Sequence, residues 1–196
     1  MTEHYFTEKP TSTLTFYNHV AILRNKEISF ITGSGLFSFK KIDRGTRLLI
    51  DTCLLEKNWK VLDLGCGYGI IGVSLKLLEP SIDVTFSDIN ERALLLTNKN
   101  LRLHNLNGTL IQSNGFEKIK DTFNTILLNP PQTAGKKLCF QLIIDSKDHL
   151  EKKGTLQVVA RHNKGGKELS KKMQEIFGHV KEISKGSGYR VYVSQK

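Results

Sequence analysis

The residues with the clearest chemical meaning are three glycines at alternate positions, Gly65, Gly67 and Gly69. They follow an apolar stretch, 60–64, in which Asp63 stands two residues before the first glycine. Glycine adopts backbone conformations closed to other residues and lets a ligand approach bare backbone amides. The pattern predicts a buried strand, a tight turn that contacts a cofactor, and a helix after the turn.

The spacing of the glycines distinguishes between two kinds of cofactor. A dinucleotide-binding turn has the pattern GxGxxG, and counting from Gly65 puts Ile70 at its third glycine position. A match that starts at Gly67 and ends at Gly72 stays open, although it places bulky isoleucines where phosphates must approach. The sequence DxGxGxG therefore favours a cofactor without a pyrophosphate.

An acidic residue, Asp88, stands at the end of the next expected strand, 83–87. Asp88 lies at a distance from the glycines that suits an acceptor for ribose hydroxyls, and Ile89 beside it could pack on an adenine face. The alternative is that Asp88 caps the helix that follows, a role that Asn90 could fill equally well.

The tetrapeptide Asn129-Pro130-Pro131-Gln132 follows a further apolar stretch. The Asn129 side-chain oxygen and the Pro130 carbonyl are two acceptors that could hold both N–H groups of an amine whose lone pair is delocalised. Such a clamp acts by position and electrostatics and requires no strong general base. The alternative is a rigid turn after a strand.

Strands and helices alternate from residue 59 onward, which predicts a largely parallel sheet with helices on both faces. The expected strands are 60–64, 83–87, 109–112, 124–128, 155–160, 180–184 and 189–194. The expected helices are 44–57, 69–78, 90–104, 116–120, 137–150 and 166–177. The last two strands should form an antiparallel hairpin because the link between them is short.

The first forty residues predict an accessory element. Apolar and polar residues alternate in 27–32 and again in 36–39, and Gly33 and Gly35 lie between the two stretches, as in a β-hairpin. We expect a single domain over 1–196, with residues 1–40 as a hairpin extension and 41–196 as the cofactor-binding core. The carboxyl ends of parallel strands meet at one crevice, so the polar residues above should share it.

Charge and cysteine usage limit the partners and the compartment. The net charge is +10, and residues 136–196 hold fourteen Lys or Arg against six Asp or Glu. Arg161 and Lys164 are candidates for phosphate contacts, although a solvated lysine-rich surface would explain the same charge. Three separated cysteines argue against disulfides or a zinc site and fit a reducing cytosol, and no apolar run is long enough to span a membrane. We expect a cytoplasmic protein without metal.

Residues 40–194 resemble a class I S-adenosylmethionine-dependent methyltransferase, on the motif VLDLGCGYGIIG followed by SDIN and NPP. Segments 4–10, 35–38 and 43–46 resemble a narrower group, the small-subunit ribosomal RNA guanine-N2 methyltransferase family and its single-domain archaeal relatives. The resemblance implies a Rossmann-like α/β fold, with a seven-stranded mostly parallel sheet and an antiparallel last strand. It also implies S-adenosyl-L-methionine as cofactor and RNA, most simply ribosomal, as partner.

The resemblance also implies roles for residues of this sequence. Asn129 and Pro130 would be catalytic, because they would hold the target amine. The residues expected at the cofactor are Asp63, Gly65, Gly67, Gly69, Asp88, Ile89, Asn114 and Thr46. The residues expected at the substrate are Pro131, Gln132, Arg161 and Lys164.

Two positions depart from the family pattern. Gln132 stands where the family carries an aromatic residue that stacks on the target base. Either stacking comes from Phe116, His4 or Tyr5, or the site binds a different group. Asn114 replaces an acidic residue that accepts the adenine amino hydrogens, and its oxygen can accept if neighbours orient the amide.

The sequence therefore predicts an RNA methyltransferase acting on an exocyclic amine, with guanine N2 of ribosomal RNA as the favoured target. A base must leave its stack to reach such a pocket. Two alternatives stay open, a protein glutamine-amide methyltransferase and a non-catalytic RNA-binding or assembly factor. The target nucleotide, the need for an assembled ribosomal subunit and the oligomeric state stay open as well.

Overall fold

The structure is a computed structural model that describes residue 8 and residues 12–196. Its strands are β1 (Phe16–Leu23), β2 (Lys26–Gly33), β3 (Lys60–Leu64), β4 (Asp83–Asp88), β5 (Thr109–Gln112), β6 (Phe123–Leu128), β7 (Leu150–Arg161), β8 (Lys181–Gly186) and β9 (Tyr189–Gln195). Its α-helices are α1 (Arg44–Thr52), α2 (Ile70–Leu78), α3 (Glu91–Leu103), α4 (Lys136–Asp148) and α5 (Lys167–Phe177). Single short turns of helix, η1 (Gln132–Ala134) and η2 (His162–Gly166), precede α4 and α5.

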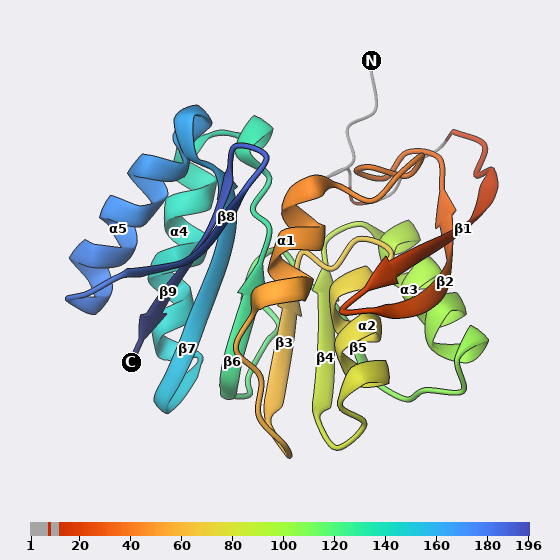
Figure 1. Ribbon diagram of the computed structural model, residues 1–196, viewed down its shortest axis with the longest axis horizontal. Helices are drawn as coiled ribbons and strands as arrows, with labels where there is room; N and C mark the ends of the chain where they lie inside the picture. Colours follow the sequence, from red (N-terminus) through yellow and green to blue (C-terminus); the bar gives the residue numbers. More distant parts are fainter. Residues whose placement is uncertain (1–7, 9–11) are drawn as a thin grey trace.

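Seven strands form one sheet in the order β5-β4-β3-β6-β7-β9-β8 (Figure 1). Strands β3 to β7 pair in parallel, and β9 runs antiparallel to both of its neighbours. This arrangement confirms the predicted mostly parallel sheet with an antiparallel last strand. Because β3, β4 and β6 are parallel neighbours, the glycine turn, Asp88 and Asn129 come out at the same edge of the sheet.

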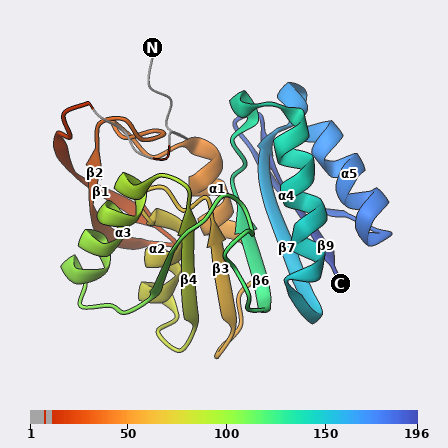
Figure 2. The same cartoon turned by 180° about the vertical axis from the view of Figure 1, so that it is seen from behind.

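The two faces of the sheet bury separate apolar clusters because successive side chains of a strand point to opposite faces. Val61 and Leu127 belong to the cluster that includes residues of α1, α2 and α3. Leu62 and Leu128, one position further along, belong to the cluster that includes residues of α4 and α5. Figure 2 shows α4 and α5 lying over β7 and β9. Within the described residues, no helix combines the length and apolar character that a membrane crossing requires.

The N-terminal hairpin exists, but its strands differ from the prediction. β2 pairs with β1, which precedes it, and the pairing runs from Phe16 opposite Gly33 to Leu23 opposite Lys26. The connecting residues Arg24 and Asn25 have φ values of 45° and 62°, as a tight two-residue hairpin turn requires. The predicted second strand, 36–39, is instead a series of turns that brings three side chains to the cavity described below.

Two predicted helices were also wrong in extent. Residues 116–120 form turns and no helix, whereas α1 stops at Thr52 and does not continue to 57. The side chain of Gln157, on β7, accepts a hydrogen bond from the Leu54 backbone N–H and donates one to the Leu54 carbonyl, both at 2.8 Å. The Leu54 N–H and carbonyl are thus hydrogen-bonded to a distant side chain, and they are not available for the hydrogen bonds of a longer helix.

Candidate active site

A cavity of about 830 Å³ opens at the carboxyl ends of β3, β4 and β6. This is a typical size for a site that holds a small molecule. Among the predicted site residues, those that line it are Thr46, Gly65, Gly67, Asp88, Ile89, Asn114, Asn129, Pro130, Pro131, Gln132, Arg161 and Lys164. Asp63 and Gly69 are the two that lie outside its lining. The fold therefore brings together segments that are spread over more than a hundred residues of sequence.

The glycine turn leaves space on its cavity side. Gly65 and Gly67 have φ values of 69° and 58°, in the left-handed region. A Cβ at either position would meet no heavy atom of the described residues within 4 Å, so both face open space. A ligand can therefore lie directly against this backbone, as the pattern predicted.

The amides of the turn, however, are already used within the protein. The N–H groups of Gly65 and Cys66 donate to the Ser87 carbonyl at 2.8 and 3.0 Å. The Gly67 N–H donates to Asp88 Oδ2 at 2.9 Å, and the Gly69 N–H donates to the Cys66 carbonyl at 2.9 Å. The expectation of bare amides was therefore wrong for these four positions. Phosphate groups need such donors, so the turn suits a cofactor that presents no phosphate to it.

Asp63 and Gly69 shape the turn from behind. The Asp63 carboxyl is fully buried, and its Oδ2 accepts a hydrogen bond from the Gly72 N–H at 2.9 Å. Burial, together with the Asp88 carboxylate, raises the pKa of Asp63 to about 7. At Gly69, with φ of 79°, a Cβ would lie 2.7 Å from Thr97 Cγ2 on α3. The structure thus gives both residues a supporting position, where the sequence placed them against the cofactor.

Asp88 joins the turn to the start of α3. Its Oδ2 accepts from Gly67 and its Oδ1 accepts from the Asn90 N–H at 2.9 Å. Asn90 itself is the N-cap of α3, because its side chain accepts from the Arg92 N–H at 2.9 Å. Burial raises the pKa of Asp88, although these backbone hydrogen bonds favour its ionised form. Asp88 is therefore not the helix cap, and each of its oxygens keeps acceptor capacity toward the cavity.

The amide of Asn114 has a defined orientation. Its Nδ2 donates to Glu117 Oε1 at 2.8 Å, which leaves Oδ1 as the acceptor of this side chain. Ile89 lines the same part of the cavity, and its carbonyl is held by Gln112 Nε2 at 3.1 Å. A neighbour thus orients the Asn114 oxygen as an acceptor.

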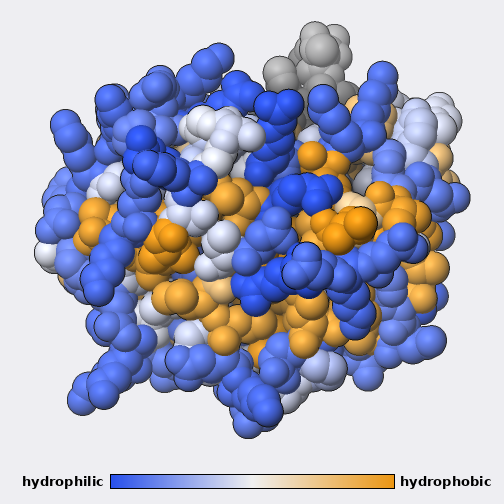
Figure 3. Space-filling view, viewed as in Figure 1, coloured by the Kyte–Doolittle hydropathy of each residue, from blue (hydrophilic) through white to orange (hydrophobic). Residues whose placement is uncertain are grey.

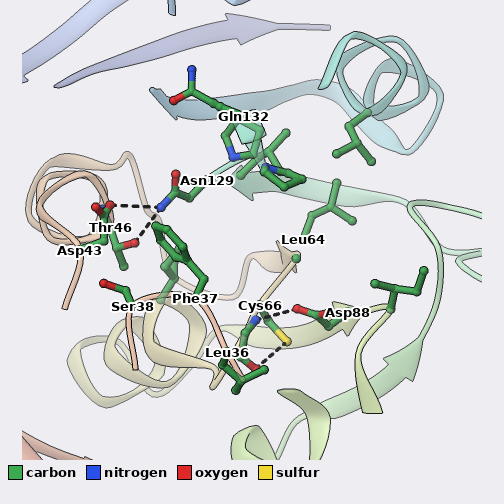
Figure 4. Close-up of a pocket in the computed structure, with 18 of the residues that line it drawn as sticks. Leu36, Phe37, Ser38, Asp43, Thr46, Leu64, Cys66, Asp88, Asn129 and Gln132 are labelled. Atoms are coloured by element: carbon green, nitrogen blue, oxygen red, sulfur yellow. Dashed lines mark hydrogen bonds between the residues drawn. The ribbon is translucent and has the colours of Figure 1, made fainter. Parts of the chain in front are cut away.

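The amide of Asn129 is oriented by the start of α1 (Figure 4). Its Nδ2 donates to Thr46 Oγ1 at 2.9 Å and to Asp43 Oδ2 at 3.3 Å. Both hydrogen bonds are made by the Nδ2 atom, so the Oδ1 atom is left as the acceptor on the other side of the amide. The Pro130 carbonyl accepts from the Gln132 N–H at 2.8 Å and retains a second lone pair. The two acceptors expected after β6 are present, and the Asn129 amide is held in place by two side chains, Thr46 and Asp43.

Gln132 ties the Asn-Pro-Pro turn to the segment after β7. Its Nε2 donates to the Lys164 carbonyl at 2.8 Å, and its Oε1 accepts from the Arg161 N–H at 3.3 Å. Both ends of the side chain are engaged, so Gln132 holds two walls of the cavity together. This use of an amide explains how the position works without an aromatic ring.

Three aromatic residues line the cavity, Phe37, Tyr68 and Tyr189, and the sequence predicted none of them. Tyr68 and Tyr189 are buried, which leaves Phe37 as the exposed ring among the three. Phe37 lines the cavity and is 47% exposed. Phe116, one of the predicted stacking residues, is buried in the core with its ring stacked on His149 at a centroid distance of 4.5 Å, so that prediction was wrong. His4 and Tyr5 lie outside the described residues. The incorrect hairpin assignment concealed Phe37, because it placed residues 36–39 in a strand.

Asp43 and Tyr189 were also missed as functional candidates. The Tyr189 hydroxyl donates to Asp43 Oδ1 at 2.9 Å and accepts from Arg161 Nε at 3.1 Å. Burial, and then the Asp43 carboxylate, raise the pKa of Tyr189. Tyr189 lies on β9, and nothing in its local sequence signals that β9 will lie beside the cavity.

The sequence is similar to those of known proteins. The family model described as methyltransferase small domain matches residues 27–193. A Bacillus subtilis (strain 168) protein named "Uncharacterized protein YbxB" is 37% identical over 200 residues, which cover 100% of both chains. The "Ribosomal RNA small subunit methyltransferase C" of Shewanella amazonensis is 31% identical over 178 residues, which cover 89% of this chain and 51% of that protein. The chain thus spans about half the length of this second relative.

A solved structure has the same fold. It is titled "T. Thermophilus 16S rRNA N2 G1207 methyltransferase (RsmC) in complex with AdoMet and Guanosine" and superposes with a TM-score of 0.79 at 21% identity. The superposition covers 95% of this chain and 52% of that one. The match to the family model extends over most of the sequence and includes both motifs from which the resemblance was inferred. The chain belongs to the methyltransferase small domain family.

Proposed function

We propose that this protein is an S-adenosylmethionine-dependent methyltransferase that acts on an exocyclic amine of an RNA base, with guanine N2 of ribosomal RNA as the favoured target. The observation that carries the proposal is the oriented amide of Asn129 in the cavity wall, whose NH2 group is hydrogen-bonded to Asp43 and Thr46 and whose oxygen is left as an acceptor. The relatives named ribosomal RNA small subunit methyltransferase C support the RNA target.

The cofactor side of the cavity fits S-adenosyl-L-methionine. Gly65 and Gly67 leave open space against the backbone, and the amides that a pyrophosphate would need are engaged elsewhere. Asp88 would accept from the ribose hydroxyls, Ile89 would pack on the adenine, and Asn114 Oδ1 would accept from its amino group. When bound, this cofactor supplies an electrophilic methyl group.

The target side fits an amine with two N–H groups. Asn129 Oδ1 and the Pro130 carbonyl would each accept one hydrogen bond, which orients the nitrogen lone pair without a general base. Phe37 would stack on the face of the base, a contact that supplies affinity independent of base identity. These residues lie on three different segments of the cavity wall.

A strongly basic surface fits an RNA partner. Arg161 and Lys164 line the cavity next to Gln132, and both side chains are exposed. Residues 136–196 hold fourteen Lys or Arg against six Asp or Glu. Hydrophilic side chains project from the side of the molecule formed by α5, which belongs to this segment (Figure 3). These cations would neutralise backbone phosphates, so RNA binding should weaken as salt concentration rises.

Methyl transfer from tritiated cofactor tests the proposal. The substrates are total RNA, small ribosomal subunits and soluble protein, each taken from cells that lack the protein. Label that is removed by ribonuclease and recovered as N2-methylguanosine is the expected result. Label in protease-sensitive material would favour a glutamine-amide target, and salt-dependent RNA binding without transfer would favour a non-catalytic role.

A further inference from the structure

Asp43 occupies the centre of a hydrogen-bond network that reaches from Asn129 to the cavity mouth. Its Oδ2 accepts from the Thr46 N–H at 3.0 Å and from Asn129 Nδ2 at 3.3 Å. Its Oδ1 accepts from the Tyr189 hydroxyl at 2.9 Å. Three segments far apart in the sequence therefore meet at one carboxylate.

We propose that Asp43 is a positioning residue that sets which end of the Asn129 amide faces the target amine, and that Tyr189 holds Asp43 in place for this task. The inference rests on the proposed function, in which Asn129 clamps an amino group. It assigns the control of that clamp to a residue outside the Asn-Pro-Pro motif.

A side-chain amide can adopt two orientations that differ by the exchange of its oxygen and its NH2 group. Rotation of the Asn129 amide by half a turn would present its NH2 group to the target, and two N–H groups would then face one another. The Thr46 hydroxyl tolerates both orientations, because it can accept from NH2 or donate to the oxygen. The Asp43 carboxylate accepts only, so it repels the amide oxygen and selects the productive orientation. Asp43, more than Thr46, therefore determines the direction of the amide.

Tyr189 fixes the carboxylate from the opposite side. Its raised pKa keeps the hydroxyl protonated, so that it donates to Asp43 while it accepts from Arg161 Nε. The ring also packs closely on the start of α1, because a Cβ at Gly45 would lie 2.5 Å from Tyr189 Cδ1. The Arg161 guanidinium lies over the same ring, 5.3 Å from its centroid. An RNA phosphate at Arg161 would thus touch the network that orients Asn129.

The competing explanation is that Asp43 merely caps α1, since it is the N-cap residue of that helix. Serine caps a helix about as well as aspartate, but its side chain is too short to reach both Asn129 and Tyr189. Asp43→Ser therefore separates the two roles. Asp43→Asn, which keeps the length and one acceptor oxygen, should restore part of the effect.

The first measurement is the single-turnover rate of methyl transfer on ribosomal RNA from cells lacking the protein. We expect Asp43→Ser to lower the rate about tenfold or more, as loss of a charged hydrogen-bond partner does, with cofactor affinity unchanged. Asp51→Asn is the matched control, because Asp51 lies on α1 and bonds the Arg24 N–H away from the cavity. In the Asn129→Ala background, Asp43→Ser should add no further loss. Additive losses, or an effect below twofold, would overturn the inference.

The second measurement needs no activity. Nuclear magnetic resonance of the side-chain amides identifies the Asn129 NH2 pair by its loss in Asn129→Ala. We expect this pair to shift in Asp43→Ser and to stay in place in Asp51→Asn. An unmoved pair would overturn the inference even if the enzyme is active. If the wild-type protein transfers no methyl group while the pair shifts, the proposed function fails and the positioning contact stands.

Discussion

The two sides of the cavity are built in different ways. On the side of the glycine turn, the contacts join backbone groups of adjacent strands, such as the Gly65 N–H and the Ser87 carbonyl. On the side of Asn129, the contacts join side chains from distant segments, and Asp43 is 86 residues from Asn129 and 146 from Tyr189 in sequence. The first side is therefore rigid by local design, whereas the second depends on the correct assembly of the whole sheet.

Substitutions on the two sides of the cavity should therefore have different effects. A change in the glycine turn disturbs the backbone itself, because Gly69 is packed against Thr97 at its left-handed φ. A change on the target side removes one side chain of a network and leaves the strands in place. We therefore expect cofactor binding and turnover to respond to separate sets of substitutions.

Asn129→Ala should have the largest effect and separates the two sides most clearly. Loss of a preorganised hydrogen-bonding group at the reacting atom costs about 10²–10³ in turnover. Calorimetry should show unchanged affinity for S-adenosylmethionine. Asn124→Ala is the control, since Asn124 lies at the other end of the same strand and bonds the Lys60 N–H. Retained turnover in Asn129→Ala would remove this residue from the chemistry.

Asp88→Ala should affect the binding of the cofactor, which Asn129→Ala leaves unchanged. It removes the expected ribose acceptor and releases the Gly67 N–H, so affinity for S-adenosylmethionine should fall about tenfold or more. Asp83→Asn changes an exposed carboxylate at the start of the same strand and should leave the affinity unchanged. Equal affinities of the wild type and Asp88→Ala in calorimetry would contradict the ribose role.

Phe37→Ala should weaken RNA recognition by a smaller factor. Stacking of one base on an aromatic ring contributes about 1–3 kcal/mol, so KM for RNA should rise by roughly tenfold. Phe37→Tyr should retain the wild-type KM. Phe39→Ala serves as the control because Phe39 packs on Tyr17, with ring centroids 5.5 Å apart, and is not part of the cavity lining. A KM that does not change in Phe37→Ala would show that the base is stacked elsewhere.

Asp63→Asn should have the smallest effect on activity, and it should act instead on the pH dependence of stability. In the folded protein the pKa of Asp63 is about 7, whereas the unfolded chain releases this proton near the ordinary aspartate pKa of 3.8. The folded state therefore binds more protons between these values, and stability falls as pH rises through them, by at most about 1.4 kcal/mol per pH unit. The variant should lack this component in denaturant titrations at pH 4 to 8. Parallel pH curves for the two proteins would refute the assignment.

Much of the fold could be predicted from local patterns in the sequence. The stretches 60–64 and 83–87 were predicted as strands that end at the glycine turn and at Asp88, and the structure has β3 and β4 there. Errors occurred where tertiary contacts override the local preference. The predicted helix 44–57 ends early because the backbone N–H and carbonyl of Leu54 are hydrogen-bonded to the Gln157 side chain. Errors also occurred in the hairpin, where β2 pairs with β1, whose sequence FYNHVAIL lacks strict alternation and therefore gave no strand signal.

The residues of the candidate site also fall into two groups, those predicted from local sequence and those placed by tertiary packing. The sequence alone determined the strand–turn–helix around Gly65 and Gly67, because left-handed glycines and buried strand residues restrict the backbone over a few positions. It also determined that Asp88 and Asn129 would emerge at one edge, because parallel strands share a direction. The tertiary structure decided which side chains surround Asn129, because Phe37, Asp43 and Tyr189 approach it through packing between elements. Such packing depends on the whole sheet and leaves no periodic signal in the residues themselves.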